Sequence, residues 1–312
     1  MKTVFLFPGQ GSQKAGMLQE LPINDPDVAE IFSLTEKVLG VPVYTLDTEE
    51  RLTSTVYVQL CLLIIGVISA KRLMGKGVKA DYVAGHSVGA FAAAVVADVI
   101  PFEQALKLVH TRGMLMEQAY PKGYGMAAVV GFSAARLQSY IQEHNAAHTT
   151  VYLSNINTAD QQVMAGAVES LNILIQTLQK SGVRKAQLLN MSVPSHCPLL
   201  AGVAAALAAQ IAPLTLLEPR IPYASNDTGR LLKTAEAIGT DLWKSVAATV
   251  RWYDATTLLF ELGARIFIEV APSGVLAKMA ISTFQEAKVL ALEETNIDAI
   301  AWLWNNYQTE QN

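Results

Sequence analysis

A serine lies between two glycines in the stretch Gly85-His86-Ser87-Val88-Gly89. A free serine hydroxyl is a weak nucleophile and needs a base within hydrogen-bond reach. A turn that joins a strand to a helix exposes such a hydroxyl at the helix N-terminus, where backbone amides favour a developing oxyanion. The pattern therefore indicates a nucleophile for acyl transfer, with a plain small-residue turn as the alternative.

The chain has five histidines that could serve as the base: His86, His110, His144, His148 and His196. Two of them lie in the polar stretch 143–148, which is typical of a solvated loop, and one lies inside a predicted helix at 102–119. His86 adjoins the serine, but successive side chains in a tight turn point apart. His196 lies in a loop held by two prolines and is the best candidate, although a loop histidine that merely packs is the alternative.

The elements around the serine support a strand–turn–helix junction. Residues 79–84 predict a short strand and the alanine-rich residues 91–99 predict a helix. Strands and helices alternate at both ends of the chain, which indicates a parallel sheet covered by helices on both faces. We predict a large α/β-hydrolase-like domain with strands at 3–7, 222–225 and 266–270 and helices at 26–39, 55–74, 199–211 and 240–262.

The middle of the chain has a different pattern, the order β-α-β-β-α-β over residues 126–190. This order is that of the ferredoxin-like arrangement. We therefore predict a small α+β subdomain at 126–190, inserted into a discontinuous catalytic domain formed by 1–125 and 191–312.

Composition narrows the class of protein. The 312 residues are 51% hydrophobic and 16% charged, with a formal net charge of −4, which gives no reason to expect nucleic acid as a partner. With two cysteines, we expect no disulfide framework. The N-terminal apolar stretch is too short for a signal sequence, and the longest apolar run, 60–70, is shorter than a membrane span of about 20 residues. We expect a soluble, cytoplasmic protein that does not bind a membrane.

Motifs along the whole chain resemble those of the malonyl-CoA:acyl-carrier-protein transacylase family. They occur in the family's order as FPGQGSQ at 7–13, Gln59 in the buried helix, GHSVG at 85–89, TRG at 111–113, NIN…VMAG at 155–166, VPSHC at 193–197, VRW at 250–252 and EVAPSGVL at 269–276. Each motif alone is of modest specificity, whereas the ordered set is highly specific.

The resemblance implies a role for each matching residue. Ser87 carries the acyl group as an ester, and His196 is its general base and later the acid for the leaving thiol. The backbone amides of Gln10 and Val88 form the oxyanion hole, and Arg112 binds the free carboxylate of a malonyl group. Without the resemblance, a surface helix is the simpler explanation of that arginine.

The resemblance also implies a second set of residues around these. Gln10, Gln59, His86 and Asn157 join the arginine in binding the substrate. A backbone carbonyl, rather than an aspartate, orients the histidine in this family, and we assign that carbonyl to Ser245, where relatives often carry glutamine. The implied chemistry uses malonyl-CoA as a substrate and requires no metal and no redox cofactor.

Ala90-Phe91 departs from the Glu-Tyr of many fatty-acid and polyketide transacylases. The form GHSVGAF resembles the transacylase (epsilon) subunit of bacterial malonate decarboxylase, whose carrier protein bears a phosphoribosyl-dephospho-CoA thiol. This resemblance predicts malonyl transfer from malonyl-CoA to that carrier, with the other decarboxylase subunits as candidate partners.

Three alternatives stay open. The acceptor can be the acyl carrier protein of fatty-acid or polyketide synthesis, which no residue excludes. A serine esterase or thioesterase of the α/β-hydrolase type expects its histidine late in the chain, whereas the last histidine here is His196. A non-catalytic scaffold within a larger complex is disfavoured, because Gln10, Ser87, Arg112 and His196 all occur together.

Overall fold

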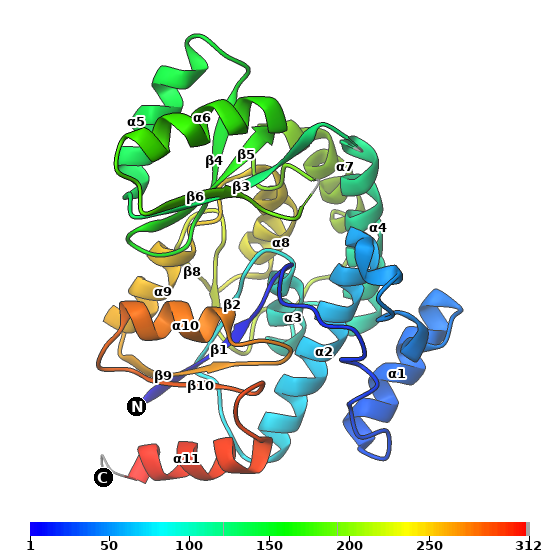
Figure 1. Ribbon diagram of the computed structural model, residues 1–312. Coiled ribbons are helices and arrows are strands. Elements are labelled where there is room, and N and C mark those ends of the chain that lie inside the picture. Colours follow the sequence, from blue (N-terminus) through cyan, green and yellow to red (C-terminus); the bar gives the residue numbers. More distant parts are fainter. Residues whose placement is uncertain (121, 192, 310–312) are drawn as a thin grey trace.

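The computed structural model describes residues 1–120, 122–191 and 193–309, and it contains two sheets (Figure 1). The larger sheet has six strands in the order β10-β9-β1-β2-β7-β8, and all its neighbours are parallel except β7 and β8. These strands are β1 (Lys2–Phe7), β2 (Tyr82–Gly85), β7 (Tyr223–Ala224), β8 (Leu231–Leu232), β9 (Ala264–Glu269) and β10 (Lys288–Ala291). The predicted α/β class is confirmed.

Helices cover both faces of the larger sheet because both faces of its strands are apolar. In the central strand β1, Phe5 and Phe7 belong to the core formed with helix α2 (Thr55–Gly75), whereas Val4 and Leu6 face the opposite core. That second core is closed by α9 (Trp252–Glu261) and α10 (Val275–Thr283). The two sets of helices lie on opposite sides of the strands in Figure 1.

Helix α2 is long and apolar enough to cross a membrane by length and composition alone, but most of its apolar stretch is buried inside the protein. The predicted apolar run 60–70 is thus only the middle of a longer helix. It packs against α1 (Pro26–Leu39), α3 (Gly89–Val96) and α4 (Phe102–Ala119). A helix that is apolar on all sides and surrounded by other elements forms the centre of a core.

The smaller sheet is antiparallel, in the order β4-β5-β3-β6, and lies above the larger sheet in Figure 1. Its elements follow in the order β3 (Tyr124–Val130), α5 (Ala134–Asn145), β4 (Val151–Ile156), β5 (Gln161–Ala167), α6 (Val168–Lys180) and β6 (Lys185–Leu188). This is the ferredoxin-like order that the sequence predicts. The domain boundaries at 125/126 and 190/191 stay a prediction.

The predicted helix at 240–262 is wrong in its middle. The chain forms α8 (Ala235–Lys244), a short 3-10 turn and then α9, with an extended segment between them. In that segment the Val250 amide donates to the Ser154 carbonyl at 2.9 Å, and the Val250 carbonyl accepts from the Ile156 amide at 2.8 Å. Pairing with β4 therefore overrides local helix propensity and ties the two sheets together.

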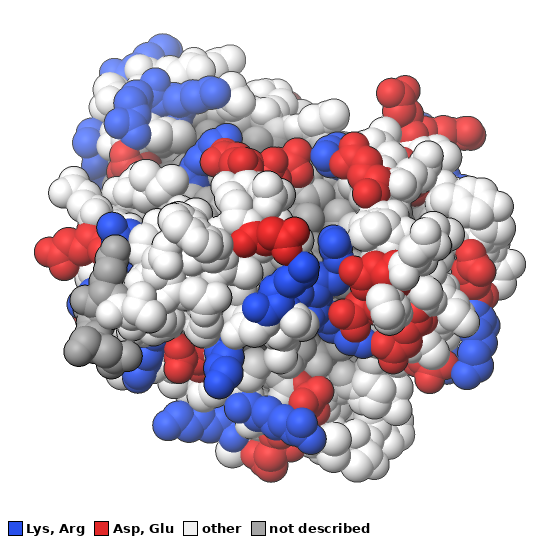
Figure 2. Space-filling model, turned by 90° about the horizontal axis from the view of Figure 1, so that it is seen from below, with Lys and Arg blue, Asp and Glu red and all other residues white. Residues whose placement is uncertain are grey.

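The remaining elements complete the larger domain. They are α7 (Ala201–Ile211), α11 (Ile297–Thr309) and the 3-10 turns η1 (Val43–Thr45), η2 (Arg51–Thr53), η3 (Pro198–Leu200) and η4 (Ser245–Ala247). Helix α11, which the sequence analysis did not predict, holds the N-terminus: Trp304 Nε1 donates to Thr3 Oγ1 at 2.8 Å. Charges of both signs are interspersed on the face seen from below in Figure 2, which agrees with the small net charge.

Candidate active site

The turn that carries Ser87 connects β2 to α3, as the sequence predicts. Ser87 has a φ of +56°, in the left-handed region that non-glycine residues rarely adopt. A Cβ atom at Gly85 would lie 2.2 Å from the Gly89 backbone, and one at Gly89 would lie 2.2 Å from the Phe7 carbonyl oxygen. Both glycines are therefore required for the turn to pack tightly against β1 and present the serine at the start of a helix.

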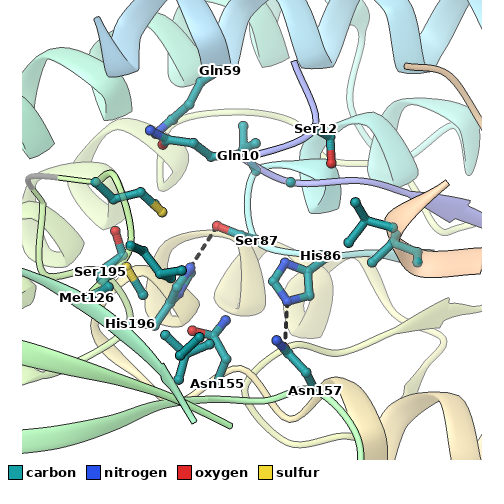
Figure 3. A pocket seen from close by; sticks show the side chains of 18 of the residues that line it. Gln10, Ser12, Gln59, His86, Ser87, Met126, Asn155, Asn157, Ser195 and His196 are labelled. Carbon is teal, nitrogen blue, oxygen red and sulfur yellow. Dashed lines mark hydrogen bonds between the residues drawn. The ribbon is translucent and has the colours of Figure 1, made fainter. Parts of the chain in front are cut away.

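His196 lies against the serine hydroxyl (Figure 3). Its Nε2 is 2.7 Å from Ser87 Oγ, and its Nδ1 is 2.6 Å from the carbonyl oxygen of Ser245. Because a carbonyl oxygen only accepts, Nδ1 must carry the proton, and Nε2 is left to accept the hydrogen bond of the serine hydroxyl. The sequence-predicted base and its orienting carbonyl are thus brought together with the serine.

The surroundings of His196 keep its imidazole neutral. The side chain is buried, and this burial together with the nearby Arg112 guanidinium lowers its pKa from 6.5 to about 3, although the bond to the Ser245 carbonyl favours the protonated form. A neutral imidazole is the form that can remove the proton of Ser87.

Arg112 reaches the site from α4 and is 2% exposed. Its Nη2 donates to Ser87 Oγ at 3.2 Å, and among the described residues no carboxylate forms an ion pair with it. Burial lowers the pKa of this guanidinium to about 10. Its approach depends on Gly113, where a Cβ would lie 2.6 Å from Val56 Cα of α2, so that only glycine lets the two helices come this close.

The backbone amides of Gln10 and Val88 are the predicted oxyanion hole. Both residues line the same cavity as Ser87, and neither backbone N–H donates a hydrogen bond within the described part of the chain. The β1–α1 connection is pressed against the turn, since a Cβ at Gly9 would lie 2.7 Å from the His86 carbonyl oxygen. Two open amides beside a nucleophile are the arrangement that stabilises a tetrahedral intermediate.

Three further predicted residues also line this cavity, which has a volume of about 170 Å³. Gln59 is 1% exposed, its Nε2 lies 3.5 Å from Met116 Sδ, and its Oε1 has no partner among the residues that the structure describes. His86 and Asn157 instead pair with one another at 3.2 Å, which points the imidazole away from Ser87 (Figure 3).

Both sheets contribute to the cavity wall. The larger domain supplies the serine turn, Gln10 and α10, whereas the smaller sheet supplies Met126, Asn155 and Val163. Methionine and leucine side chains form much of the remaining lining, so polar and apolar groups line the same cavity. Apolar groups around a site strengthen electrostatic interactions within it.

The sequence analysis did not identify Asn226, whose side chain contacts the serine turn from the end of β7. Its one local signal is a polar run, Ser225-Asn226-Asp227, directly after a strand. Ser154 was also missed; its hydroxyl donates to the Ser195 carbonyl at 3.0 Å and so holds the histidine loop.

Within the described residues, no group of three His, Cys, Asp or Glu side chains is close enough to hold a metal ion.

The chain is similar to known proteins over nearly its whole length. The acyl transferase domain family matches residues 4–304. The malonyl CoA-acyl carrier protein transacylase of Salmonella typhimurium is 33% identical over 295 residues, which cover 93% of this chain and 95% of that protein. The solved structure of the corresponding transacylase of Coxiella burnetii is 33% identical, with a TM-score of 0.91 and 96% of each chain covered.

One similar structure contains a carrier protein. It is a malonyl-transacylase in complex with the acyl carrier protein of a type II polyketide synthase, 31% identical to this chain with a TM-score of 0.91, covering 96% of this chain and 99% of that one.

Proposed function

The chain belongs to the acyl transferase domain family, and from this membership and the contacts of Ser87 we propose that it transfers a malonyl group from malonyl-CoA to the thiol of an acyl carrier protein. The protein is therefore an acyltransferase. The observation that supports the malonyl group most directly is the buried Arg112 guanidinium, which faces the nucleophile and has no carboxylate partner among the described residues.

In the first half-reaction, Ser87 Oγ attacks the thioester carbonyl carbon while its proton passes to His196 Nε2. The carbonyl electrons move to an oxyanion that accepts hydrogen bonds from the amides of Gln10 and Val88. When the intermediate collapses, the carbon–sulfur bond breaks and CoA leaves as a thiol with the proton from the imidazole. The product is a malonyl ester on Ser87.

The second half-reaction repeats these steps in the opposite direction. The carrier thiol gives its proton to His196 and attacks the ester carbonyl, and Ser87 leaves as a hydroxyl with that proton returned. One thioester is consumed and one is formed, so the exchange needs no external energy source. The Ser245 carbonyl keeps Nδ1 protonated throughout and so fixes the tautomer.

Arg112 gives the site a preference for an acyl group that ends in a carboxylate. A guanidinium binds a carboxylate through two parallel hydrogen bonds, and a buried one benefits most because water does not compete. Gln59 also lines this cavity and adds a further polar side chain to it. A bound malonyl carboxylate would draw Arg112 away from Ser87 Oγ and leave the hydroxyl to His196 alone.

The carrier is the finer part of the proposal. The relatives favour an acyl carrier protein of fatty-acid or polyketide synthesis over the phosphoribosyl-dephospho-CoA carrier of malonate decarboxylase. The decarboxylase prediction depends on Ala90-Phe91, and both side chains are buried in α3 at 0% and 1% exposure. Side chains inside the core cannot contact a docked carrier, so this departure is weak evidence about the acceptor.

An assay of both carriers tests the proposal. The purified protein is incubated with labelled malonyl-CoA and with either a fatty-acid acyl carrier protein or the decarboxylase carrier, each bearing its thiol. We expect label on the fatty-acid carrier, and none with Ser87→Ala, which lacks the attacking oxygen. Preferential labelling of the decarboxylase carrier would restore that assignment, and rapid release of free malonate without either carrier would favour a thioesterase.

A further inference from the structure

The carboxamide of Asn226 spans the base of the nucleophile turn. Its Oδ1 accepts the Ser87 backbone N–H at 2.9 Å, and its Nδ2 donates to the Gly85 carbonyl oxygen at 2.8 Å. The residue lies 139 positions after the serine and is 3% exposed. A single side chain from the end of β7 thus holds the turn on both sides of His86.

The turn needs this support because its conformation is disfavoured. A non-glycine residue in the left-handed region is strained, and Ser87 is such a residue. Within the described chain, the Ser87 N–H has no partner other than Asn226. Without that side chain, a buried donor and a buried acceptor would both lose their hydrogen bonds, and other conformations of the turn would compete.

Asn226 is itself fixed from two directions. Its backbone N–H donates to Asp241 Oδ2 at 3.2 Å, and its carbonyl accepts from the Arg251 amide at 2.7 Å. The buried Asp241 carboxylate also accepts from Tyr223 Oη at 2.8 Å and from Ser225 Oγ at 2.6 Å. The carboxamide is therefore anchored to α8 and to the segment that pairs with the smaller sheet, rather than to a mobile loop.

The two successive amides of the turn, those of Ser87 and Val88, differ in their hydrogen bonding. Asn226 occupies the Ser87 N–H, whereas the next amide, that of Val88, donates no hydrogen bond within the described residues and belongs to a residue that lines the cavity. Holding the first amide fixes the peptide planes on both sides of Ser87, and with them the direction of the second amide and of Oγ. We propose that Asn226 is a positioning residue, which sets Ser87 Oγ and the Val88 amide in the geometry required for acylation.

The inference depends on the proposed acyl-enzyme, so its test measures that intermediate. Wild type, Asn226→Ala and Asn226→Asp are mixed rapidly with malonyl-CoA, and the amplitude and rate constant of ester formation are recorded with the melting temperature. Asn145→Ala is the matched control: that carboxamide also bridges backbone groups, accepting from the Val151 amide at 2.8 Å and donating to its carbonyl at 2.9 Å, but it lies at the end of α5, which packs on the smaller sheet.

We expect Asn226→Ala to acylate at near-full amplitude per folded molecule with a rate constant reduced about 10- to 100-fold, because small misplacements of reacting groups cost factors of this size. Asn226→Asp keeps the acceptor for Ser87 and should lose less. Asn145→Ala should keep the wild-type rate constant. If the alanine variant does not fold, the aspartate variant is used instead. A reduced rate constant at normal amplitude in that variant would support the inference.

Two results would overturn the inference. One is a rate constant of the Asn226 variants within about twofold of wild type. The other is a loss of amplitude at an unchanged rate constant, which is the signature of a purely structural role. If the wild-type protein itself forms no malonyl ester, the proposed function fails and the inference falls with it, so the two failures are distinguishable.

Discussion

At the scale of residues, the hydroxyl of Ser87 is shared by an imidazole at 2.7 Å and a guanidinium at 3.2 Å. These two groups affect one another, because the charge of Arg112 disfavours a second positive charge on His196. In the proposed mechanism Arg112 thereby keeps the base neutral and lies beside the acyl group. We therefore expect acyl selectivity and base strength to be linked through one buried arginine.

The first prediction concerns selectivity. Arg112→Ala should reduce the rate of malonyl transfer far more than that of acetyl transfer, because only the malonyl group loses a buried charge partner, at a cost of about 2–5 kcal/mol. Competing malonyl-CoA and acetyl-CoA in an ester-formation assay measures the ratio. Arg112→Lys is the control, since it keeps the charge without the two-pronged geometry and should recover part of the preference. An unchanged ratio in the alanine variant would contradict the role.

A second prediction concerns the pH dependence of acylation. Burial and Arg112 lower the pKa of His196 to about 3, so the base stays neutral well below the ordinary value of 6.5. The acid limb of single-turnover acylation should therefore lie well below pH 6.5. In Arg112→Ala the limb should move to higher pH, because one of the two causes is removed. A wild-type midpoint at 6.5 or above would refute this.

The same shift affects stability. Between pH 3 and 6.5 the unfolded chain binds a proton at His196 that the folded protein does not, so this residue makes the free energy of unfolding fall as the pH is lowered through that window. Protonation of His196 in the folded protein would place a second positive charge in a buried site beside Arg112.

At the scale of elements, helix α10 is held at its N-terminus by a buried carboxylate. Glu269 Oε2 accepts from the Ala277 amide at 2.6 Å, and its Oε1 accepts from Ser273 Oγ at 3.1 Å. Burial raises the pKa of Glu269 to about 7 despite these bonds. Leu276 and Met279 of this helix line the cavity, so Glu269 helps to position one wall of the site.

The third prediction follows from this carboxylate. The folded protein holds a proton on Glu269 between pH 4.5 and 7 that the unfolded chain releases, so this residue makes stability fall as the pH rises through that window. Denaturant unfolding at pH 5 and 7.5 should show this component in wild type and in the surface control Glu286→Gln, but not in Glu269→Gln. Glu269→Ala should be destabilised by about 1–3 kcal/mol, because the Ala277 amide loses its acceptor. Identical pH dependence in wild type and Glu269→Gln would exclude the idea.

Local patterns predicted the elements that depend on local sequence. The strand–turn–helix at 79–99 and the ferredoxin-like order at 126–190 were both found, because each is encoded by apolar spacing and glycine placement over a few residues. The break at 248–251 was not found, since it forms only when Val250 pairs with β4. Asn226 was missed for the same reason: its partners lie 139 and 141 residues away.

The candidate site was predicted through the resemblance more than through the residues alone. The sequence by itself suggested Ser87 and left the choice of base and the role of Arg112 open. Their contacts with the same hydroxyl now come from the structure, whereas their roles in catalysis stay predictions that the experiments above test.

At the scale of the whole molecule, the cavity joins two sheets that are also connected through the Val250 segment, the histidine loop and the His86–Asn157 pair. A ligand bound there contacts both domains at once. Its binding free energy should therefore stabilise the entire fold rather than one part of it.

The fourth prediction uses this connection. In Ser87→Ala, which can bind malonyl-CoA without turning it over, ligand at about 100 times its Kd should add about 2.7 kcal/mol to the free energy of unfolding and raise the melting temperature in a single transition. Adding Arg112→Ala to that background should abolish most of the shift at the same concentration. Two separate transitions, of which only one moves, would show that the ligand contacts a single domain.

The position of β1 has a consequence for how the protein is made. Residues 2–7 are synthesised before β2 and β9, between which they lie, and β9 ends only at Glu269. On the ribosome, β1 therefore has one unpaired edge until β9 has emerged. During that time the apolar helix α2 has only part of its final cover. The strand order alone thus leaves an unpaired strand edge and apolar surface uncovered during synthesis, independent of anything at the catalytic centre.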